Sequence, residues 1–404
     1  MSDWQEYLLE DVIEKFIDYR GKTPTKTSSG VPLITAKVVK AGKILTPNEF
    51  IAPEDYDDWM TRGLPEINDV VLTTEAPLGE VALIKDKNVA LAQRIITLRG
   101  KKELLHNPFL KYYFQNEAGQ HDLQSRASGT TVFGIKASVL KKVPIEIPAL
   151  EEQKAIASVL SSLDDKIDLL HRQNTTLERM AETLFRQWFV EEAQSFASGK
   201  IGALIEGTFG GDWGKETPEG DFNNAVNCIR GTDIADLQTG LAKKIPLRFV
   251  STKKLQSIEP KNGDIIFEIS GGTETQSTGR ATYINDDVRS LFAYPLVFSN
   301  FCRLLRPLNT TYSYFIYLYL SYLYEQDEFF GLENGSSGIK NLNYKALFFE
   351  LDYPMPSSDR VQKFNDLVTP SFSKINQNKK QIKTLEKLRD NLLPKLMSGE
   401  VRVS

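Results

Sequence analysis

Residues 151–192, EEQKAIASVLSSLDDKIDLLHRQNTTLERMAETLFRQWFVEE, decide the fold of this chain. Alternating steps of four and three residues from Ile156 reach an apolar residue every time except at Asn174. This period of 3.5 residues predicts a long helix packed in a coiled coil. No glycine or proline interrupts the stretch, which would span roughly 60 Å as a helix. The predicted seam consists of Ile156, Leu160, Leu163, Ile167, Leu170, Asn174, Leu177, Ala181, Leu184 and Trp188.

The partner of this helix is predicted to lie near the C-terminus of the same chain. Residues 165–180 and 373–388 match at Lys-Ile, Gln and Thr-Leu-Glu in one register, which indicates an internal repeat. An antiparallel pairing with maximal overlap sets Asn174 opposite Asn378, and asparagines in a seam fix the register of a coiled coil. The second seam consists of Ile375, Asn378, Ile382, Leu385, Arg389, Leu392 and Leu396.

Charge supports the pairing of the two helical regions. Residues 149–199 carry five positive and nine negative side chains, whereas residues 353–404 carry ten and five. Both helices are predicted to end at a Ser-Gly pair, at 198–199 and 398–399, because glycine readily adopts the left-handed turn after a helix. Pro370 and Pro394 predict a break or bend in the second helix, since proline removes a backbone hydrogen bond.

Composition limits the class of protein. The 404 residues are 41% hydrophobic, which is enough for two or three ordinary cores. No long uncharged apolar run and no signal peptide is found, so a soluble, cytoplasmic protein without a membrane partner is expected. Cys228 and Cys302 fit buried, reduced thiols. The net charge of −4 offers no basic footprint for nucleic acid.

Residues 1–148 are predicted to form one mixed domain. Strands are expected at 32–39, 69–74, 80–85, 95–98 and 143–147, and a short helix at 108–117. The stretches between them at 20–30, 74–79 and 128–136 are rich in turn-forming residues.

Residues 200–352 are predicted to repeat this plan with different loops. Residues 262–267 resemble 68–72, residues 314–324 take the place of the short helix, and residues 334–340 resemble 128–136 before a predicted strand at 347–351. The chain order is then domain (1–148), helical region (149–199), domain (200–352), helical region (353–404). The predicted fold class is α+β, with two mixed domains related by approximate two-fold symmetry on an antiparallel helix pair.

No motif for catalysis stands out. The sequence has no phosphate-binding loop, dinucleotide fingerprint or His-Glu-x-x-His zinc motif. His106, His121 and His171 do not cluster and fit surface positions. The glycine-rich stretch 271–279 fits a polar loop, and the tyrosines of 312–324 fit a helix packed on its sheet better than a base-stacking surface. The chain is therefore interpreted as non-catalytic, with no metal site and no cofactor of its own.

Three stretches in order carry a family resemblance. IPALEEQKAI at 147–156, LFRQWFV at 184–190 and LLPKLMSGEVRV at 392–403 resemble the conserved regions of the specificity (S) subunits of type I restriction-modification systems. That family has the same order of domain, helix, domain and helix, so the resemblance covers the whole chain. The second helical region departs from the pattern, with PSSDRVQ at 356–362 where Pro-x-Leu-x-Glu-Gln is usual.

The resemblance implies a function in DNA recognition. Each domain would be a target recognition domain that reads one half of a bipartite, asymmetric double-stranded DNA site. The helices would set the spacer and dock two methyltransferase (modification) subunits, which bind S-adenosylmethionine, flip an adenine and methylate its N6. Restriction subunits would join the full complex. Two alternatives remain, a coiled-coil scaffold with two protein-binding domains and a stand-alone DNA-binding regulator.

Loop residues that can read base edges or phosphates are the candidates for DNA contact. In the first domain they are Lys22, Thr23, Lys26, Thr35, Lys37, Thr74, Glu75, Gln93, Arg94, Ser128, Thr130 and Lys136. In the second they are Arg230, Thr232, Lys243, Lys244, Thr273, Gln276, Arg280, Ser336, Ser337 and Lys340. An ordinary solvated surface residue is the alternative for each, and the loops before the last strands are alternatively structural turns.

Overall fold

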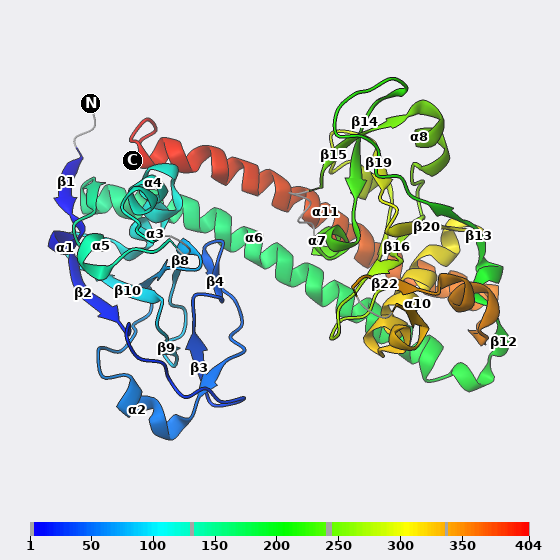
Figure 1. Ribbon diagram of the computed structural model, residues 1–404, viewed down its shortest axis with the longest axis horizontal. Helices are drawn as coiled ribbons and strands as arrows, with labels where there is room; N and C mark the ends of the chain where they lie inside the picture. The colour runs from blue at the N-terminus through cyan, green and yellow to red at the C-terminus, as the bar shows by residue number, and fades with distance from the viewer. Residues whose placement is uncertain (1–3, 130–132, 240–244, 336–337, 404) are drawn as a thin grey trace. The chain divides into compact units, whose positions relative to one another are not determined.

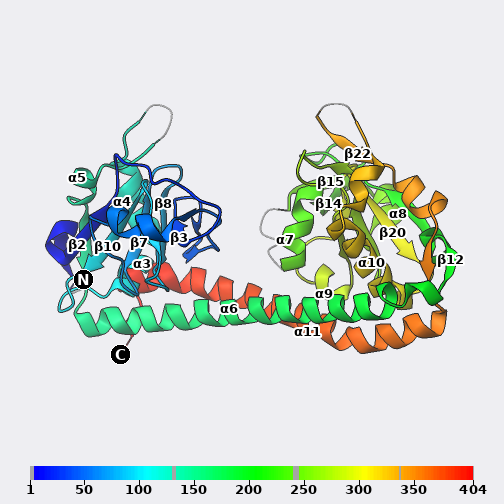
Figure 2. The ribbon, with the colours of Figure 1, turned by 90° about the horizontal axis from the view of Figure 1, so that it is seen from below.

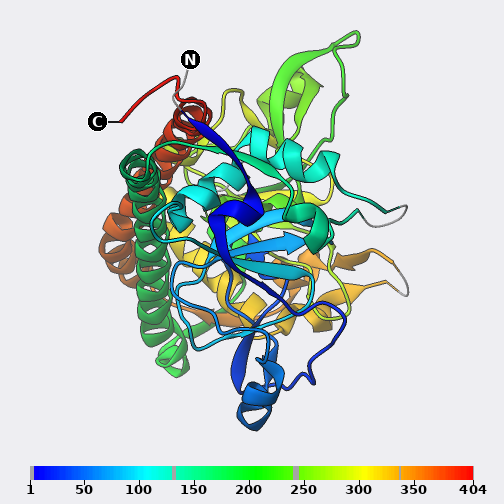
Figure 3. The same cartoon turned by 90° about the vertical axis from the view of Figure 1, so that its left-hand side faces the viewer.

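The computed structural model describes residues 4–129, 133–239, 245–335 and 338–403, which fall into two compact units (Figure 1). Unit 1 contains Met1–Lys166 and Leu385–Ser404, and unit 2 contains Ile167–Thr384. Both ends of the chain therefore belong to unit 1 (Figure 3). Each unit combines helices and sheets, as the sequence predicts.

Unit 1 is built on a four-stranded antiparallel sheet in the order β2, β10, β7, β8. In a second sheet β3 pairs with β6 antiparallel and with β9 parallel, while β1 pairs with β11 and β4 with β5. The strands are β1 (Gln5–Leu8), β2 (Ile13–Asp18), β3 (Val31–Ile34), β4 (Val39–Lys40), β5 (Lys43–Ile44), β6 (Phe50–Ile51), β7 (Val70–Thr74), β8 (Leu78–Leu83), β9 (Ala90–Leu91), β10 (Ile95–Gly100) and β11 (Pro144–Ile147). The helices are α1 (Leu9–Val12), α2 (Tyr56–Trp59), α3 (Asn107–Gln115), α4 (Glu117–Ser125) and α5 (Ala137–Leu140).

Unit 2 repeats this topology. Its four-stranded antiparallel sheet has the order β13, β20, β16, β18, and β14 pairs with β15 antiparallel and with β19 parallel. β12 pairs with β23, and β22 lies between β17 and β21. The strands are β12 (Ala197–Gly199), β13 (Ile205–Gly210), β14 (Phe222–Ile229), β15 (Leu247–Ser251), β16 (Ile265–Glu268), β17 (Ser270–Gly271), β18 (Ala281–Tyr283), β19 (Leu296–Phe298), β20 (Cys302–Pro307), β21 (Glu333–Asn334), β22 (Lys340–Leu342) and β23 (Tyr353–Met355). The helices are α7 (Ile234–Thr239), α8 (Thr252–Ile258), α9 (Asp286–Arg289) and α10 (Ser313–Glu325).

The same ion pair fixes the central strands in both units. Arg99 at the end of β10 donates two hydrogen bonds of 2.9 and 2.7 Å to Asp69 before β7. Arg306 in β20 donates two hydrogen bonds of 3.1 and 2.7 Å to Asp264 before β16. Both carboxylates are buried, so each arginine neutralises a negative charge whose burial without a partner would be costly. The repeat that the sequence suggests at residues 68 and 262 is therefore structural.

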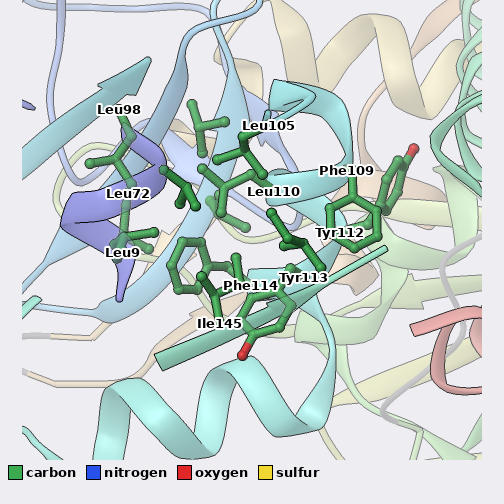
Figure 4. Close-up of a cluster of buried hydrophobic side chains, with 14 of the residues drawn as sticks. Leu9, Leu72, Leu98, Leu105, Phe109, Leu110, Tyr112, Tyr113, Phe114 and Ile145 are labelled. Atoms are coloured by element: carbon green, nitrogen blue, oxygen red, sulfur yellow. The ribbon is translucent and has the colours of Figure 1, made fainter. Parts of the chain in front are cut away.

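The main core of unit 1 lies between its sheet and α3. Figure 4 shows Phe109, Tyr112 and Phe114 of α3 in one buried cluster with Leu72 and Leu98 of the sheet. Pro108 stands in the first turn of α3, where its missing N–H has no partner to lose. In unit 2, α10 takes the same role, and its Tyr317 and Tyr319 are buried. The prediction that this tyrosine-rich segment packs on its sheet is confirmed.

The long helices α6 (Leu150–Phe185) and α11 (Ser358–Met397) lie side by side and antiparallel within each unit (Figure 2). In unit 2, Nδ2 of Asn378 donates to Oδ1 of Asn174 at 2.8 Å, the pair expected from the sequence. Further along, Nη2 of Arg360 donates to the carbonyl of Trp188 at 2.9 Å. In unit 1, Nη1 of Arg389 donates to Oδ1 of Asp164 at 3.0 Å.

Of the break or bend predicted at each proline of the second helix, the break is wrong, since α11 runs as one helix through Pro370 and Pro394, while a bend stays a prediction. Both prolines are exposed. A carbonyl that loses its helical partner on a solvated face can bond to water, so the helix tolerates the ring. Gly399 follows α11 with φ 70°, which agrees with the predicted left-handed turn.

The first helix ends differently from the prediction. After Phe185 the chain makes a π-helical turn at Arg186–Val190, and Ser198-Gly199 belongs to β12 instead of a helix cap. The predicted strand at 347–351 is also wrong, because Ala346–Glu350 form another π-helical turn. A short apolar run does not distinguish a strand from a buried helical turn. The strand that follows this turn in the sequence is β23.

Three further findings concern membrane spans, metal sites and the cysteines. Among the described residues, the helices are all too short or too polar to cross a membrane. The same residues contain no group of three His, Cys, Asp or Glu side chains arranged to hold a metal ion. Cys228 and Cys302 are buried and free, as predicted.

Candidate nucleic-acid interface

Turns from distant parts of unit 1 meet at one edge of the domain. The N–H of Ala92 donates to the carbonyl of Ile34 at 3.0 Å, and the N–H of Thr74 donates to the carbonyl of Arg94 at 2.9 Å. The N–H of Ile135 donates in turn to the carbonyl of Thr74 at 2.9 Å. We call residues 20–23, 35–37, 74–76, 92–94, 128 and 133–136 the loop edge of unit 1. Its turns are fixed by the strands that they connect.

The centre of this loop edge is the turn at Gln93 and Arg94. Arg94 has φ 75°, and its side chain is 56% exposed with Nε 3.0 Å from Oε1 of Glu75. Both partners of this ion pair are exposed, so water screens it and the guanidinium can exchange partners at little cost. Nε2 of Gln93 donates to Oγ1 of Thr23 at 3.1 Å. The structure thus brings four predicted residues together.

The other predicted residues of unit 1 fall into three groups. Lys22, Ser128 and Lys136 are exposed on the loop edge, whereas Thr35 and Thr74 are buried. Lys26 and Lys37 lie 2.8 and 3.8 Å from carboxylate oxygens of Glu49, and the hydrogen bond from Lys26 lowers the pKa of that carboxyl. Thr130 lies outside the described residues.

Equivalent main-chain hydrogen bonds hold together a loop edge in unit 2. The N–H of Ser299 donates to the carbonyl of Ile229 at 2.9 Å, and the N–H of Ile269 donates to the carbonyl of Phe301 at 2.8 Å. The N–H of Leu342 donates to the carbonyl of Ile269 at 2.9 Å. We call residues 230–232, 269–273, 299–301, 333–335 and 338–342 the loop edge of unit 2. Its strand β22 lies at the end of the unit away from α6 and α11 (Figure 2).

Most predicted cations of unit 2 are paired with carboxylates. Nε and Nη2 of Arg280 donate to Glu268 at 2.9 and 2.7 Å, and the Glu268 side chain is only 2% exposed. Arg230 makes the same two-bonded contact with Asp233 at 2.9 and 2.7 Å, and Nζ of Lys340 lies 3.0 Å from Oε2 of Glu333. These hydrogen bonds raise the already high pKa values of Arg280 and Arg230.

The remaining predicted residues of unit 2 are small and polar. Thr232, Thr273 and Gln276 are exposed, and Oγ1 of Thr273 accepts the N–H of Gln276 at 3.0 Å, which closes a tight turn. Lys243, Lys244, Ser336 and Ser337 lie outside the described residues. Sequence reasoning missed Asn300 and Phe301, both exposed on this loop edge. No sequence pattern relates them to Gln93 and Arg94, because only the main-chain hydrogen bonds reveal the equivalence.

The predicted helix-pair residues differ in burial. Ile156, Leu160, Ile167, Leu170, Asn174, Ile375, Asn378, Ile382 and Leu396 are buried. Leu163, Leu177, Leu184, Trp188, Leu385 and Leu392 are partly buried. Beyond Ala181, Phe185 at the end of α6 and Phe189 in the following π-helical turn are buried, because both rings pack against Phe315 of α10. An open hollow of about 470 Å³ lies along the pair between Leu169, Gln173 and Lys374.

Comparison with known proteins gives one consistent result. Residues 1–179 match the family model described as the type I restriction modification DNA specificity domain. The chain is 28% identical over 363 residues to the type I restriction enzyme MjaIX specificity subunit of Methanocaldococcus jannaschii, covering 83% of this chain and 78% of the relative. It is 21% identical over 432 residues to the putative MjaX specificity subunit of the same organism, covering 100% and 94%.

A solved structure supports the fold. The crystal structure of a type I restriction-modification S subunit from M. genitalium superposes with a TM-score of 0.58 at 19% identity, covering 98% of this chain and 96% of the other. The order of two mixed domains and two long helices is therefore shared with that protein.

Proposed function

Because this chain is a relative of the specificity subunits of type I restriction-modification systems, we propose that its two units each read one half of a bipartite, asymmetric DNA site. The single observation that carries the proposal is the duplicated loop edge, in which equivalent main-chain hydrogen bonds hold different side chains. A palindromic site would need identical readers, whereas two unlike edges on one frame suit a site with unlike halves.

The side chains of the two loop edges fit base and phosphate contacts. A guanidinium such as that of Arg94 can bind guanine O6 and N7, and exposed Lys22 and Lys136 can contact phosphates. On the loop edge of unit 2, Thr232 offers a hydroxyl group, and Gln276, bonded to Thr273 of that edge, offers an amide group. The net charge of −4 is compatible with DNA binding when partner subunits supply part of the phosphate contact.

The helix pair would organise the complex. In this proposal α6 and α11 set the spacer between the half-sites and dock two methyltransferase (modification) subunits, with restriction subunits joining the full assembly. The chemistry then belongs to the methyltransferase, which binds S-adenosylmethionine and flips the target adenine. This chain contributes specificity without a catalytic group or cofactor, and the complex acts on DNA in the cytoplasm.

The proposal is tested by co-expressing the chain with a cognate methyltransferase subunit and mapping N6-methylated adenines across the host genome. The expected result is a motif of two unlike halves separated by a fixed gap. Absence of both a stable complex and any modification would contradict the proposal and favour a protein-binding scaffold.

The role of the helices in spacing has its own test. Inserting seven residues into each of α6 and α11 keeps the seam in register and lengthens the pair by roughly 10 Å, or about three base pairs. The gap in the modified motif should lengthen accordingly. An unchanged gap would mean that another part of the complex sets the spacing.

A further inference from the structure

The turn at residues 299–301 places a phenylalanine where unit 1 has an arginine. In unit 1, the turn is held by the bonds from Ala92 to Ile34 and from Thr74 to Arg94. In unit 2, Ser299 bonds to Ile229 and Ile269 bonds to Phe301 in the same way. Asn300 therefore occupies the place of Gln93, and Phe301 occupies the place of Arg94.

Phe301 is exposed although its backbone is fixed. Its carbonyl accepts the N–H groups of both Ile269 at 2.8 Å and Ser270 at 3.2 Å, and Phe301 directly precedes β20. Its side chain is nevertheless 48% exposed. A single exposed apolar residue is ordinary on a protein surface. What distinguishes Phe301 is that it lies at the position where the other unit presents the exposed guanidinium of Arg94.

The neighbouring cations of unit 2 are poorly placed to replace that cation. Arg280 is bound twice to Glu268, and withdrawing it would leave a buried carboxylate without its partner. Lys340 is paired with Glu333, whose side chain is 5% exposed. The exposed pair of Arg94 and Glu75 carries no such penalty. Among the residues that the structure describes, apolar and amide groups are therefore the ones available for readout at this turn of unit 2.

Base chemistry then indicates what such a turn can read. In the major groove an apolar side chain contacts the C5 methyl group of thymine, and an asparagine amide pairs with N6 and N7 of adenine. We propose that Asn300 and Phe301 read A·T pairs in the half-site of unit 2, with Phe301 against a thymine methyl group. This inference rests on the proposed function. It adds the class of base pair that unit 2 reads at this turn and the two residues that read it.

The test uses the complex of this chain with its methyltransferase subunits and duplexes that carry the mapped motif. The half-site of unit 2 is assigned by exchanging residues 200–352 for those of a relative. Each thymine of that half is then replaced singly by deoxyuridine, which removes only the methyl group. We expect one position at which the replacement weakens binding roughly fourfold, as for about 0.8 kcal/mol per buried methyl group. In Phe301→Ala, replacing thymine by deoxyuridine at that position should no longer weaken binding.

Two controls make the result specific. Leu308→Ala removes another exposed apolar side chain, 58% exposed, beyond the opposite end of β20 and should leave the deoxyuridine response unchanged. Arg94→Ala should alter only the half-site of unit 1. Retained recognition of the other bases of the unit 2 half by Phe301→Ala shows that unit 2 of this variant is folded.

Failure of the inference can be distinguished from failure of the proposed function. A wild-type complex without any sequence preference would contradict the proposed function itself. A clear bipartite motif in which the unit 2 half has no A·T pair, or in which every thymine tolerates deoxyuridine, overturns the inference alone. An unchanged deoxyuridine response in Phe301→Ala has the same meaning.

Discussion

The two units hold their segments of the long helices with different chemistry on the same topology. In unit 1, Asp164 of α6 accepts hydrogen bonds from Lys111 and Tyr112 at 2.8 Å each and from Arg389 at 3.0 Å. In unit 2, Phe185 of α6 lies among the rings of α10 and α11, with its centroid 5.9 Å from that of Phe315. One unit uses a buried charge cluster and the other an aromatic cluster.

The difference shows which features the frame requires. The strand order and the Asp–Arg pair between the central strands recur in both units, whereas the contact with the helices is free to vary. A charge cluster depends on each partner, because removing one leaves the others buried and unpaired. An aromatic cluster distributes its stabilisation over many contacts. Each kind of contact predicts its own response to mutation and pH.

The largest effect is expected for Asp164→Ala. The change leaves buried Lys111 without its carboxylate and leaves Arg389 with Asp390 alone, and it should lower the free energy of unfolding by about 3 to 5 kcal/mol. Urea unfolding of the full chain measures it, with exposed Asp165→Ala as the matched control. Equal costs for the two variants would show that the cluster contributes nothing.

The same variant should respond to pH. Burial alone would raise the pKa of Asp164, but Lys111 and the hydrogen bonds hold it below its ordinary value. Stability from a carboxyl with a lowered pKa is fully present above its unfolded value, about 3.9, and is lost as the pH falls through the folded value. The difference between wild type and Asp164→Ala should therefore shrink below about pH 4.

In unit 2 the counterpart is Phe185→Ala. Deleting this buried ring should cost about 3 to 4 kcal/mol, because the aromatic neighbours cannot fill the cavity. The cost should stay constant with pH, in contrast to that of Asp164→Ala. Exposed Gln187→Ala in the following turn is the control. A strongly pH-dependent cost for Phe185→Ala would remove the distinction between the two clusters.

A smaller effect is expected at the loop edges. Arg94→Ala should lose roughly 1 to 3 kcal/mol of discrimination at one base if the guanidinium reads a guanine. Arg280→Ala, by contrast, should mainly destabilise unit 2, because buried Glu268 would lose its partner. Binding to single-base variants of the motif and thermal unfolding of each variant separate the two effects. An unchanged motif with Arg94→Ala would exclude that residue as a base reader.

The smallest effect is expected at Glu178 in unit 2. Burial raises the pKa of Glu178 to about 7, and burial lowers the pKa of Lys379 to about 8. A carboxyl whose pKa is raised by folding contributes stability to the folded chain at low pH. That contribution is lost as the pH rises from the pKa of the unfolded state, about 4.3, to that of the folded state, about 7. Glu178→Gln should therefore stabilise the chain by about 1 kcal/mol more at pH 8 than at pH 4. The opposite sign would mean that the carboxylate is favourably paired when ionised.

Much of the architecture could be predicted from the sequence because its signals are periodic. The seam through Asn174 and its repeat around Asn378 follow from local spacing, and the expected hydrogen bond between them is present. The π-helical turns at Arg186–Val190 and Ala346–Glu350 have no such signal, since they depend on rings packed from other elements. The Asp164 cluster joins residues far apart in the chain. Phe301 could not be predicted because its equivalence with Arg94 lies in the backbone.

The most direct test that each unit reads its own half-site is the exchange of residues 200–352 for those of a relative with a different motif. The hybrid is co-expressed with the methyltransferase subunits, and modified adenines are mapped across the genome. We expect one half of the motif to change while the other half and the gap stay the same. A motif that changes in both halves, or in neither, would contradict the claim that each unit reads its own half-site.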